Sequence, residues 1–211
     1  MRILALIRGV VLPVGRTPPA PATGNKPAAD ANAVTGDAIT LFTSAQKPVT
    51  VTGGDITATY KLTPQLEATV AAERFNYNFS EAGTLAFARP ETRAYLRIDY
   101  ESGPWTGMLR GTWTGQQDLA KFYDYANNQR YNFDGTKKMD KSPSFWTVDL
   151  RGEYRINQQW SGFLGADNVF DFKQSDKESM LWVDSCGSID VTHIWGPNRG
   201  RFIYVGVKFT L

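Results

Sequence analysis

Cysteine and histidine are almost absent from this sequence of 211 residues, which holds one of each. A single cysteine excludes a disulfide within the chain, and a single histidine excludes a metal site built from several histidines. No apolar run reaches the roughly 18 residues that a membrane-spanning helix needs. An excess of positive charge is missing too, because 23 Lys and Arg face 21 Asp and Glu, and this balance does not favour nucleic acid as a partner.

What the sequence has in abundance is aromatic residues, at 13 %, and glycine, with 19. Six of the aromatic residues are tryptophans. This composition without hydrophobic helices is typical of an all-β protein, including a membrane barrel. Neither a phosphate-binding glycine loop nor a nucleophile elbow is present, so no enzyme class, cofactor or catalytic residue is predicted.

Residues 1–36 differ in composition from the remainder of the chain. Arg2 lies near their start, and Arg8 interrupts the apolar stretch that surrounds it. A tract rich in Pro, Ala and Thr follows. Such a segment fits either a signal peptide or a disordered leader. We therefore divide the chain into a leader or disordered segment at 1–36 and a β-domain at 37–211.

From about residue 37 the sequence alternates between apolar and polar residues, which is the period of β-strands. The pattern predicts an antiparallel meander of about eight strands. The clearest strands cover 92–102, 105–114, 145–156 and 201–211. Weaker ones cover 49–62, 66–77 and 160–170, and a doubtful one lies near 38–44.

The connections between these strands alternate in length. Tight turns are predicted at 63–65, 102–104 and 157–159, whereas the segments 78–91, 115–144 and 171–200 are long. Outer-membrane barrels have short periplasmic turns and longer extracellular loops, whereas a soluble sandwich has more even spacing. The spacing therefore favours a segment of a transmembrane β-barrel.

Large aromatic residues lie near the ends of the apolar faces of the strands. Eight residues of a tilted strand rise roughly 20 Å along the membrane normal, which approaches the apolar band of about 25 Å between two aromatic girdles. We predict that these aromatic residues lie at the lipid interface: Tyr60, Tyr100, Trp105, Trp113, Trp146, Tyr154 and Trp160.

Charged residues occupy the opposite faces of the same strands. They are costly against hydrocarbon but can pair across strands in a polar lumen, so ion pairing is favoured over acid–base catalysis for the neighbouring carboxylates. We predict that the lumen-facing residues are Arg93, Arg97, Asp99, Glu101, Arg110, Asp149, Arg151, Glu153, Arg155 and Lys208.

Several motifs between residues 48 and 211 resemble the closing strands of TonB-dependent outer-membrane receptors. The segment 145–154 (FWTVDLRGEY) is followed by 165–172 (GADNVFDF), which resembles the penultimate strand of that family. The final segment 195–211 (WGPNRGRFIYVGVKFTL) resembles its last strand. The earlier segments 63–66 (TPQL) and 100–105 (YESGPW) also fit.

This resemblance implies the C-terminal part of a receptor barrel in the cell outer membrane. The family takes up scarce ligands such as ferric siderophores, haem or cobalamin, using a plug domain powered through TonB. Nothing in the sequence resembles that plug or the TonB contact, and the last residue is Leu211 where the family usually has an aromatic. The expected partners are outer-membrane lipid, the barrel-assembly machinery, and the plug and barrel strands that this sequence lacks.

Two other readings remain open. The chain could be a self-contained eight-stranded barrel with a structural or adhesion role. An outer-membrane enzyme is less favoured, because no Ser/His/Asp set is evident and His193 is predicted to be a loop residue. Cys186 is predicted to be either a free thiol or half of a disulfide with missing sequence. The aromatic and basic residues of 115–144 suit either ligand capture or interface anchoring, namely Tyr123, Tyr125, Tyr131, Phe133, Lys137 and Lys138.

Overall fold

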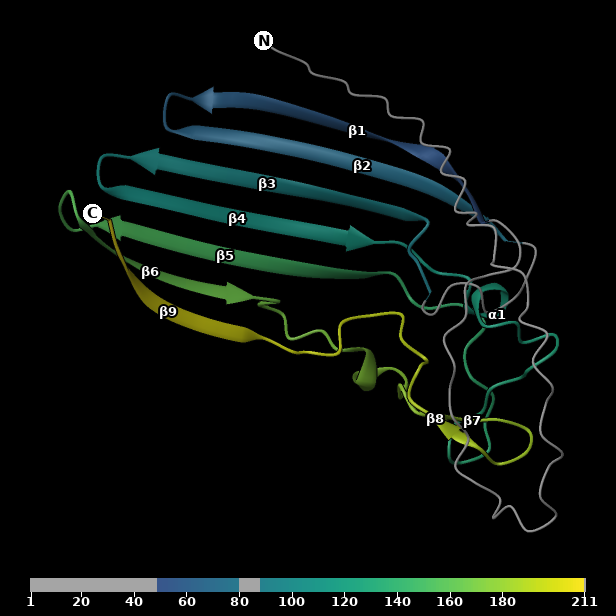
Figure 1. Ribbon diagram of the computed structural model, residues 1–211. Coiled ribbons are helices and arrows are strands. Elements are labelled where there is room, and N and C mark those ends of the chain that lie inside the picture. Colours follow the sequence, from purple (N-terminus) through teal and green to yellow (C-terminus); the bar gives the residue numbers. More distant parts are fainter. Residues whose placement is uncertain (1–48, 80–87, 211) are drawn as a thin grey trace, which may run out of the picture.

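The computed structural model describes residues 49–79 and 88–210, which form a seven-stranded antiparallel sheet and a group of packed loops at one end of it (Figure 1). The strands follow one another across the sheet in chain order, except that the last one pairs with β6. Their bounds are β1 Val49–Thr63, β2 Leu66–Phe79, β3 Thr92–Ser102, β4 Trp105–Thr114, β5 Phe145–Arg155, β6 Trp160–Asp167 and β9 Phe202–Phe209.

The predicted all-β antiparallel meander is confirmed. Strands β3 and β4 have the predicted ends, and the others differ by a few residues. The predicted strand near 38–44 lies outside the described residues. Two further strands, β7 Trp182–Val183 and β8 Ile189–Asp190, form a small separate hairpin within the last long connection.

Short and long connections lie at opposite ends of the sheet, as their alternation in the sequence predicts. The three tight turns, which follow β1, β3 and β5, gather at the end where the C-terminus lies (Figure 1). The connections after β4 and β6 lie at the other end. The connection after β2 is described only from residue 88 onward.

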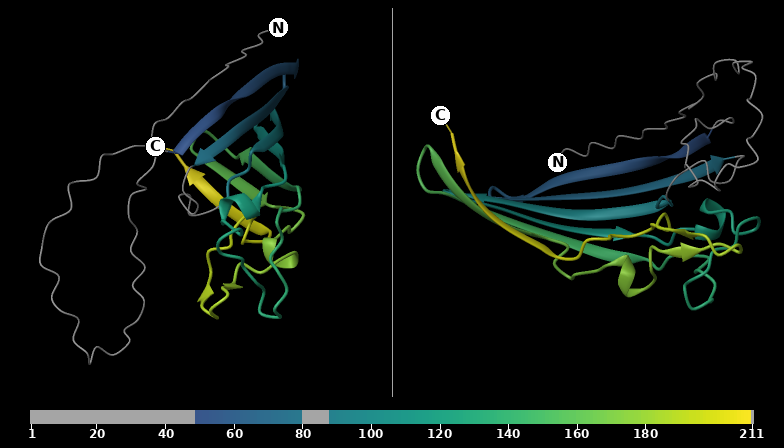
Figure 2. Two further views of the ribbon diagram at one scale, coloured as in Figure 1. Left: turned by 90° about the vertical axis from the view of Figure 1, so that its right-hand side faces the viewer. Right: turned by 60° about the horizontal axis from the view of Figure 1, so that its bottom comes forward.

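The described strands form an open sheet, with β1 and β9 at its two edges. It is a curved and twisted layer (Figure 2), and the right-handed twist of strands gives open sheets this form. In the described part of the chain the sheet therefore does not close into the small barrel of the alternative reading.

The two long connections contain the few helical residues of the described chain. Helix α1 Leu119–Phe122 lies in the first, and the 3-10 helix η1 Gln174–Asp176 lies in the second. In residues 49–79 and 88–210, no helix has both the length and the apolar character to cross a membrane. We call the paired segments 115–144 and 168–201 the loop cap.

A turn at Asn168 closes the base of the second long connection and explains why β6 ends at Asp167 instead of continuing to residue 170. Asn168 and Asp171 both have left-handed backbone angles, with φ of 51° and 59°. The Asn168 side chain donates to the Phe172 carbonyl at 2.7 Å, and Asp171 accepts from the Arg201 N–H at 2.7 Å. The two ends of this connection are thereby joined where β9 begins.

Candidate functional site

Strand register gives the sheet one charged face and one apolar face. Arg97 lies opposite Arg110, and Arg110 lies opposite Asp149 on the next strand. Leu109, one position away, lies opposite Ile98 and Leu150 on the other face. By this register all ten residues predicted to face the lumen share the charged face.

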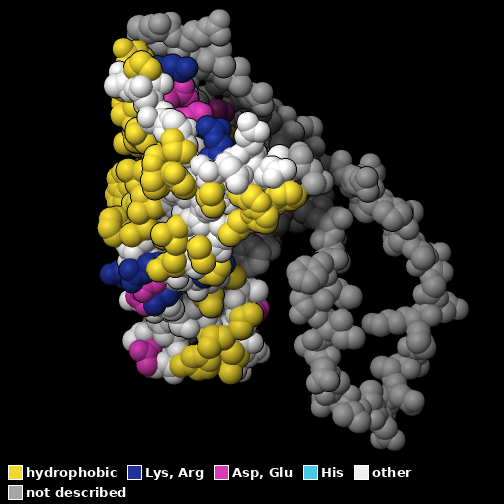
Figure 3. All heavy atoms as spheres, turned by 90° about the vertical axis from the view of Figure 1, so that its left-hand side faces the viewer, with side chains coloured by type: hydrophobic (Ala, Val, Ile, Leu, Met, Phe, Trp, Pro, Cys, Tyr) yellow, Lys and Arg dark blue, Asp and Glu magenta, His cyan; other side chains and the backbone are white. Residues whose placement is uncertain are grey.

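Many side chains of the apolar face are exposed in this chain, for example 41 % of Leu109 and 80 % of Val205. Figure 3 views the molecule from the tight-turn end and shows hydrophobic side chains gathered along one side of it. A monomeric soluble protein rarely exposes so large an apolar area. The face therefore requires an apolar covering.

The predicted interface aromatics share this apolar face. The rings of Trp105 and Tyr154 lie 4.6 Å apart near the tight turns. Trp113 lies opposite Trp146 at the other end of the same strands. The structure thus brings them together in two groups, one at each end of the strands, and their contact with lipid stays a prediction.

The charged face carries ion pairs at its surface. Arg97 donates to Asp99 at 2.7 Å, and Arg93 approaches Glu73 to the same distance. Glu153 accepts from Ser161 at 2.8 Å and lies 3.4 Å from Arg151. Pairing thus accounts for Asp99 and Glu153, as the sequence indicates, whereas Asp149 accepts from the Asn168 N–H at 2.9 Å. Because all of these side chains are partly exposed, each pair adds only about 0–1 kcal/mol to stability.

Arg97 and Arg110 form a direct cross-strand pair of like charges, which destabilises a sheet unless the charges find other partners. The Arg97 guanidinium turns to Asp99 on its own strand. The Arg110 guanidinium instead lies over the ring of Tyr95, 4.5 Å from the ring centre. Cation–π contact therefore separates the two arginines.

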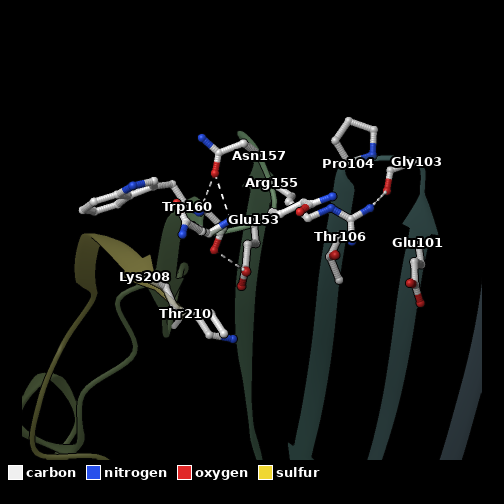
Figure 4. A pocket seen from close by; sticks show the side chains of 13 residues that line it. Glu101, Gly103, Pro104, Thr106, Glu153, Arg155, Asn157, Trp160, Lys208 and Thr210 are labelled. Atoms are coloured by element: carbon white, nitrogen blue, oxygen red, sulfur yellow. Dashed lines mark hydrogen bonds between the residues drawn. The ribbon is translucent and has the colours of Figure 1, made fainter.

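A hollow of about 210 Å³ lies on the charged face at the tight-turn end (Figure 4). Glu101, Glu153, Arg155 and Lys208 contribute charges of both signs to its lining. Arg155 also donates to the Gly103 carbonyl at 3.2 Å, which holds its guanidinium across the turn. The hollow is therefore a polar surface of mixed charge.

The loop cap contains the hydrophobic core of the described chain. Every buried hydrophobic side chain among residues 49–79 and 88–210 belongs to the cap: Leu119, Phe122, Tyr123, Tyr125, Trp182 and Trp195. Phe145 and Phe172 stack at its base, with ring centres 4.6 Å apart. The cap is therefore a folded unit rather than a set of independent loops.

His193 belongs to a loop, as predicted, but its side chain is fully buried. Its Nε2 lies 2.8 Å from the carboxylate of Glu178, whose other oxygen accepts from the Met139 N–H at 2.9 Å. Burial lowers the pKa of His193, and the hydrogen bond to Glu178 opposes that effect without cancelling it. This buried pair joins the two segments of the cap.

Three further buried or part-buried side chains stabilise the cap, one within segment 168–201 and two between the two segments. Gln174 accepts from the N–H groups of Trp195 and Gly196 and donates to the His193 carbonyl at 2.6 Å. Gln117 donates to the Trp195 carbonyl, and Tyr123 donates to the Ile194 carbonyl. Sequence reasoning missed this network, because a Gln or Tyr within a polar loop carries no periodic signal.

The six aromatic and basic residues predicted for ligand capture or anchoring differ in burial. Tyr131 is half-buried, and its backbone pairs with that of Val183. Tyr123, Tyr125 and Lys138 are buried, and Lys138 donates to the Ser179 carbonyl at 2.7 Å. Their burial corrects the interpretation of these three as capture residues. Phe133 is 59 % exposed and lines an open hollow with Lys137.

Arg130 and Cys186 lie at the outer part of the cap. The Arg130 guanidinium is held between the rings of Tyr123 and Trp182, 4.0 Å from each ring centre, and burial lowers its pKa. Cys186 is exposed in the turn between β7 and β8, where its N–H donates to Asp184. Cys186 is a free thiol within the described chain, and a disulfide to other sequence stays a prediction.

Comparison with known proteins agrees with this architecture. Residues 13–169 match the family model of the TonB dependent receptor-like β-barrel. The chain therefore belongs to the TonB-dependent receptor β-barrel family, which at the level of the family means a receptor rather than an enzyme. The match includes part of the segment 1–36, whose assignment as a leader stays a prediction. No curated protein matches the chain.

Solved structures show the same fold. The copper transporter OprC matches 77 % of this chain with a TM-score of 0.50 and 19 % identity. A mutant of the ferric enterobactin receptor PfeA from Pseudomonas aeruginosa matches 77 % with a TM-score of 0.53 and 17 % identity. The matched region covers 24 % and 22 % of those two chains, so this chain spans about a quarter of their length.

Proposed function

We propose that the chain forms part of the barrel wall of a TonB-dependent receptor in the outer membrane. Its apolar face contacts lipid, and its charged face looks into the lumen. The separation of the two faces by strand register, with aromatic groups at both ends, is the observation that carries this proposal. Hydrocarbon makes the opposite orientation costly, because ten charged side chains would then meet lipid.

The partners of this wall are a plug, further barrel strands, and TonB acting through the plug. The mixed-charge hollow at the tight-turn end supports a polar protein contact on the lumen side. Both edges of the described sheet carry unpaired backbone groups, which further strands would satisfy. Insertion into the membrane would use the barrel-assembly machinery.

The ligand we propose is a scarce nutrient of the ferric siderophore, haem or cobalamin class. Two structurally similar proteins, a copper transporter and a ferric enterobactin receptor, support such a ligand. The loop cap lies at the end of the sheet where a receptor receives its ligand. Phe133 and Lys137 present an exposed aromatic ring and a cation there.

Spin labels at Leu109 and Arg110 test which face meets lipid. Each position would be changed to cysteine in a Cys186→Ser background, and the labelled chain would be refolded into phospholipid vesicles. We expect the label at 109 to be accessible to dissolved oxygen and the label at 110 to be accessible to a water-soluble nickel complex. Leu150 and Asp149 are opposite these positions on β5 and provide a matched second pair.

The proposal fails if label 110 is the one in contact with oxygen-rich hydrocarbon. It also fails if both labels are equally accessible to the nickel complex, because a soluble sheet would give that result. Agreement between the pairs on β4 and β5 would exclude a local distortion at one labelled site.

A further inference from the structure

The single histidine of the sequence lies in the joint between the two segments of the loop cap. Histidine is the side chain whose ordinary pKa lies within the physiological range. His193 has no exposed surface, and Glu178, its 2.8 Å partner, is also buried. A proton-binding group therefore lies in the interior of the cap, where a change of charge is costly.

His193 and Glu178 both belong to segment 168–201, and each of them contacts segment 115–144. Glu178 reaches across to the Met139 N–H, and His193 Nδ1 lies 3.5 Å from the Tyr125 hydroxyl. The His193 backbone is held as well, because its carbonyl accepts from Gln174. Loosening the pair would therefore loosen the contact between 168–201 and 115–144.

Burial is the main effect that disfavours a positive charge on His193, nearby cations add to it, and the carboxylate of Glu178 opposes it. From the opposite segment, the cations Lys138 and Arg130 act on His193, and the rings of Tyr123 and Tyr125 pack against it. Its own segment supplies the carboxylate of Glu178. Asp140 and Asp190 lie further out, where they act on Tyr125 and Arg130.

The hydrogen bonds accommodate the neutral form of the ring, which burial favours. With the proton on Nε2, the ring donates to the Glu178 carboxylate, and Nδ1 is free to accept from the Tyr125 hydroxyl. Protonation of Nδ1 would turn that acceptor into a donor and would add a buried cation near Lys138 and Arg130.

We propose that the loop cap is an acid-sensitive clamp, in which neutral His193 holds the two segments together and proton uptake by His193 releases them. This inference goes beyond the proposed receptor function, because it concerns the conformation of the cap and not the ligand. Its tests are therefore independent of whether the chain serves in uptake.

The sign of the pH dependence follows from the direction of the shift. Burial lowers the pKa of His193 in the closed cap below its ordinary value of 6.5. The open cap then binds a proton more readily, so stability present above pH 6.5 is lost as the pH falls. Burial raises the pKa of Glu178, but its hydrogen bonds and neighbouring cations outweigh burial and leave it below the ordinary 4.5. Between pH 7.5 and 5, proton uptake by His193 therefore determines how the stability of the closed cap changes with pH.

The distance between the two segments provides the test. One spin label would be attached to the native Cys186 and a second to an Asn128→Cys substitution, both exposed in the cap. In the full chain in phospholipid vesicles, we expect one narrow distance distribution at pH 7.5. Below pH 6.5 a broad population should grow, with the opening constant rising by up to about tenfold per pH unit.

The variant His193→Gln is the matched control, because glutamine can donate to Glu178 but takes up no proton. Its distance distribution should be the same at pH 7.5 and pH 5. If this variant does not fold, NMR of the unaltered chain serves instead, since its one histidine gives a single imidazole signal. That signal should titrate below 6.5. Wild-type distances that do not change with pH, or a titration at or above 6.5, would overturn the proposal.

Discussion

The sheet and the loop cap of this chain are organised in different ways. In the sheet, alternate residues form two faces, and even central apolar side chains such as Leu109 are 41 % exposed. In the cap no such period exists, yet Leu119 and His193 are both fully buried. The sheet is thus ordered by backbone pairing and the cap by side-chain packing.

This difference separates the sources of stability. The apolar face of the sheet gains hydrophobic stabilisation only when its surroundings cover it, which lipid would do. The cap already holds its own core and a buried hydrogen-bond network. We therefore expect the two regions to respond to different substitutions, and to respond independently.

Removal of Gln174 should have the largest effect, confined to the cap. The variant Gln174→Ala leaves three groups without their partner, namely the buried Trp195 N–H, the part-buried Gly196 N–H and the buried His193 carbonyl. Each such group costs about 1–3 kcal/mol, so we expect a loss of roughly 3–5 kcal/mol and an open cap. Limited proteolysis should then cut within 115–144 and 168–201, while circular dichroism keeps the strand signal.

The variant Gln116→Ala is the matched control, because Gln116 is an exposed glutamine in the other segment of the loop cap, 115–144. It should leave the proteolysis pattern unchanged. Loss of the strand signal in Gln174→Ala would contradict the comparison, since it would show that the sheet depends on the cap for its order.

A charge placed on the apolar face should have the next largest effect, confined to the sheet in lipid. Leu109→Arg puts a guanidinium near the middle of β4, which costs about 2–4 kcal/mol at the centre of a bilayer. The control Thr112→Arg places the same charge on the opposite face, where we expect little change. Urea titration of the chain refolded in vesicles measures both values. An equal loss of stability in the two variants would contradict the distinction between the apolar and the charged face.

Much of the sheet was predictable from the sequence, because strand alternation is a local signal. The bounds of β3 and β4 follow from it directly. The end of β6 does not, since it depends on the left-handed turn at Asn168, which in turn relies on Phe172 and Arg199. The motif GADNVFDF was visible as a family resemblance, but its physical role in closing the loop was not.

Little of the cap could be predicted. Gln117 and its partner Trp195 are 78 residues apart, and Tyr123 is 71 residues from Ile194. Such pairs have no spacing rule, and their burial follows from the way two irregular segments pack. For this reason the sequence predicts ligand capture or interface anchoring for Tyr123 and Lys138, whereas both side chains are buried in the cap.

The smallest expected effect concerns the ion pairs of the charged face, which sharpen the contrast with the buried pair of the cap. Glu73 and Arg93 lie 2.7 Å apart, with 30 % and 44 % of their side chains exposed. A double-mutant cycle of Glu73→Gln and Arg93→Gln in vesicles should give a coupling of at most about 1 kcal/mol, because water screens both charges. It should also weaken as salt is added. A coupling well above this value that salt does not change would show that the charged face is shielded from water, and the lumen of the assembled wall would then be filled by protein at this strand pair.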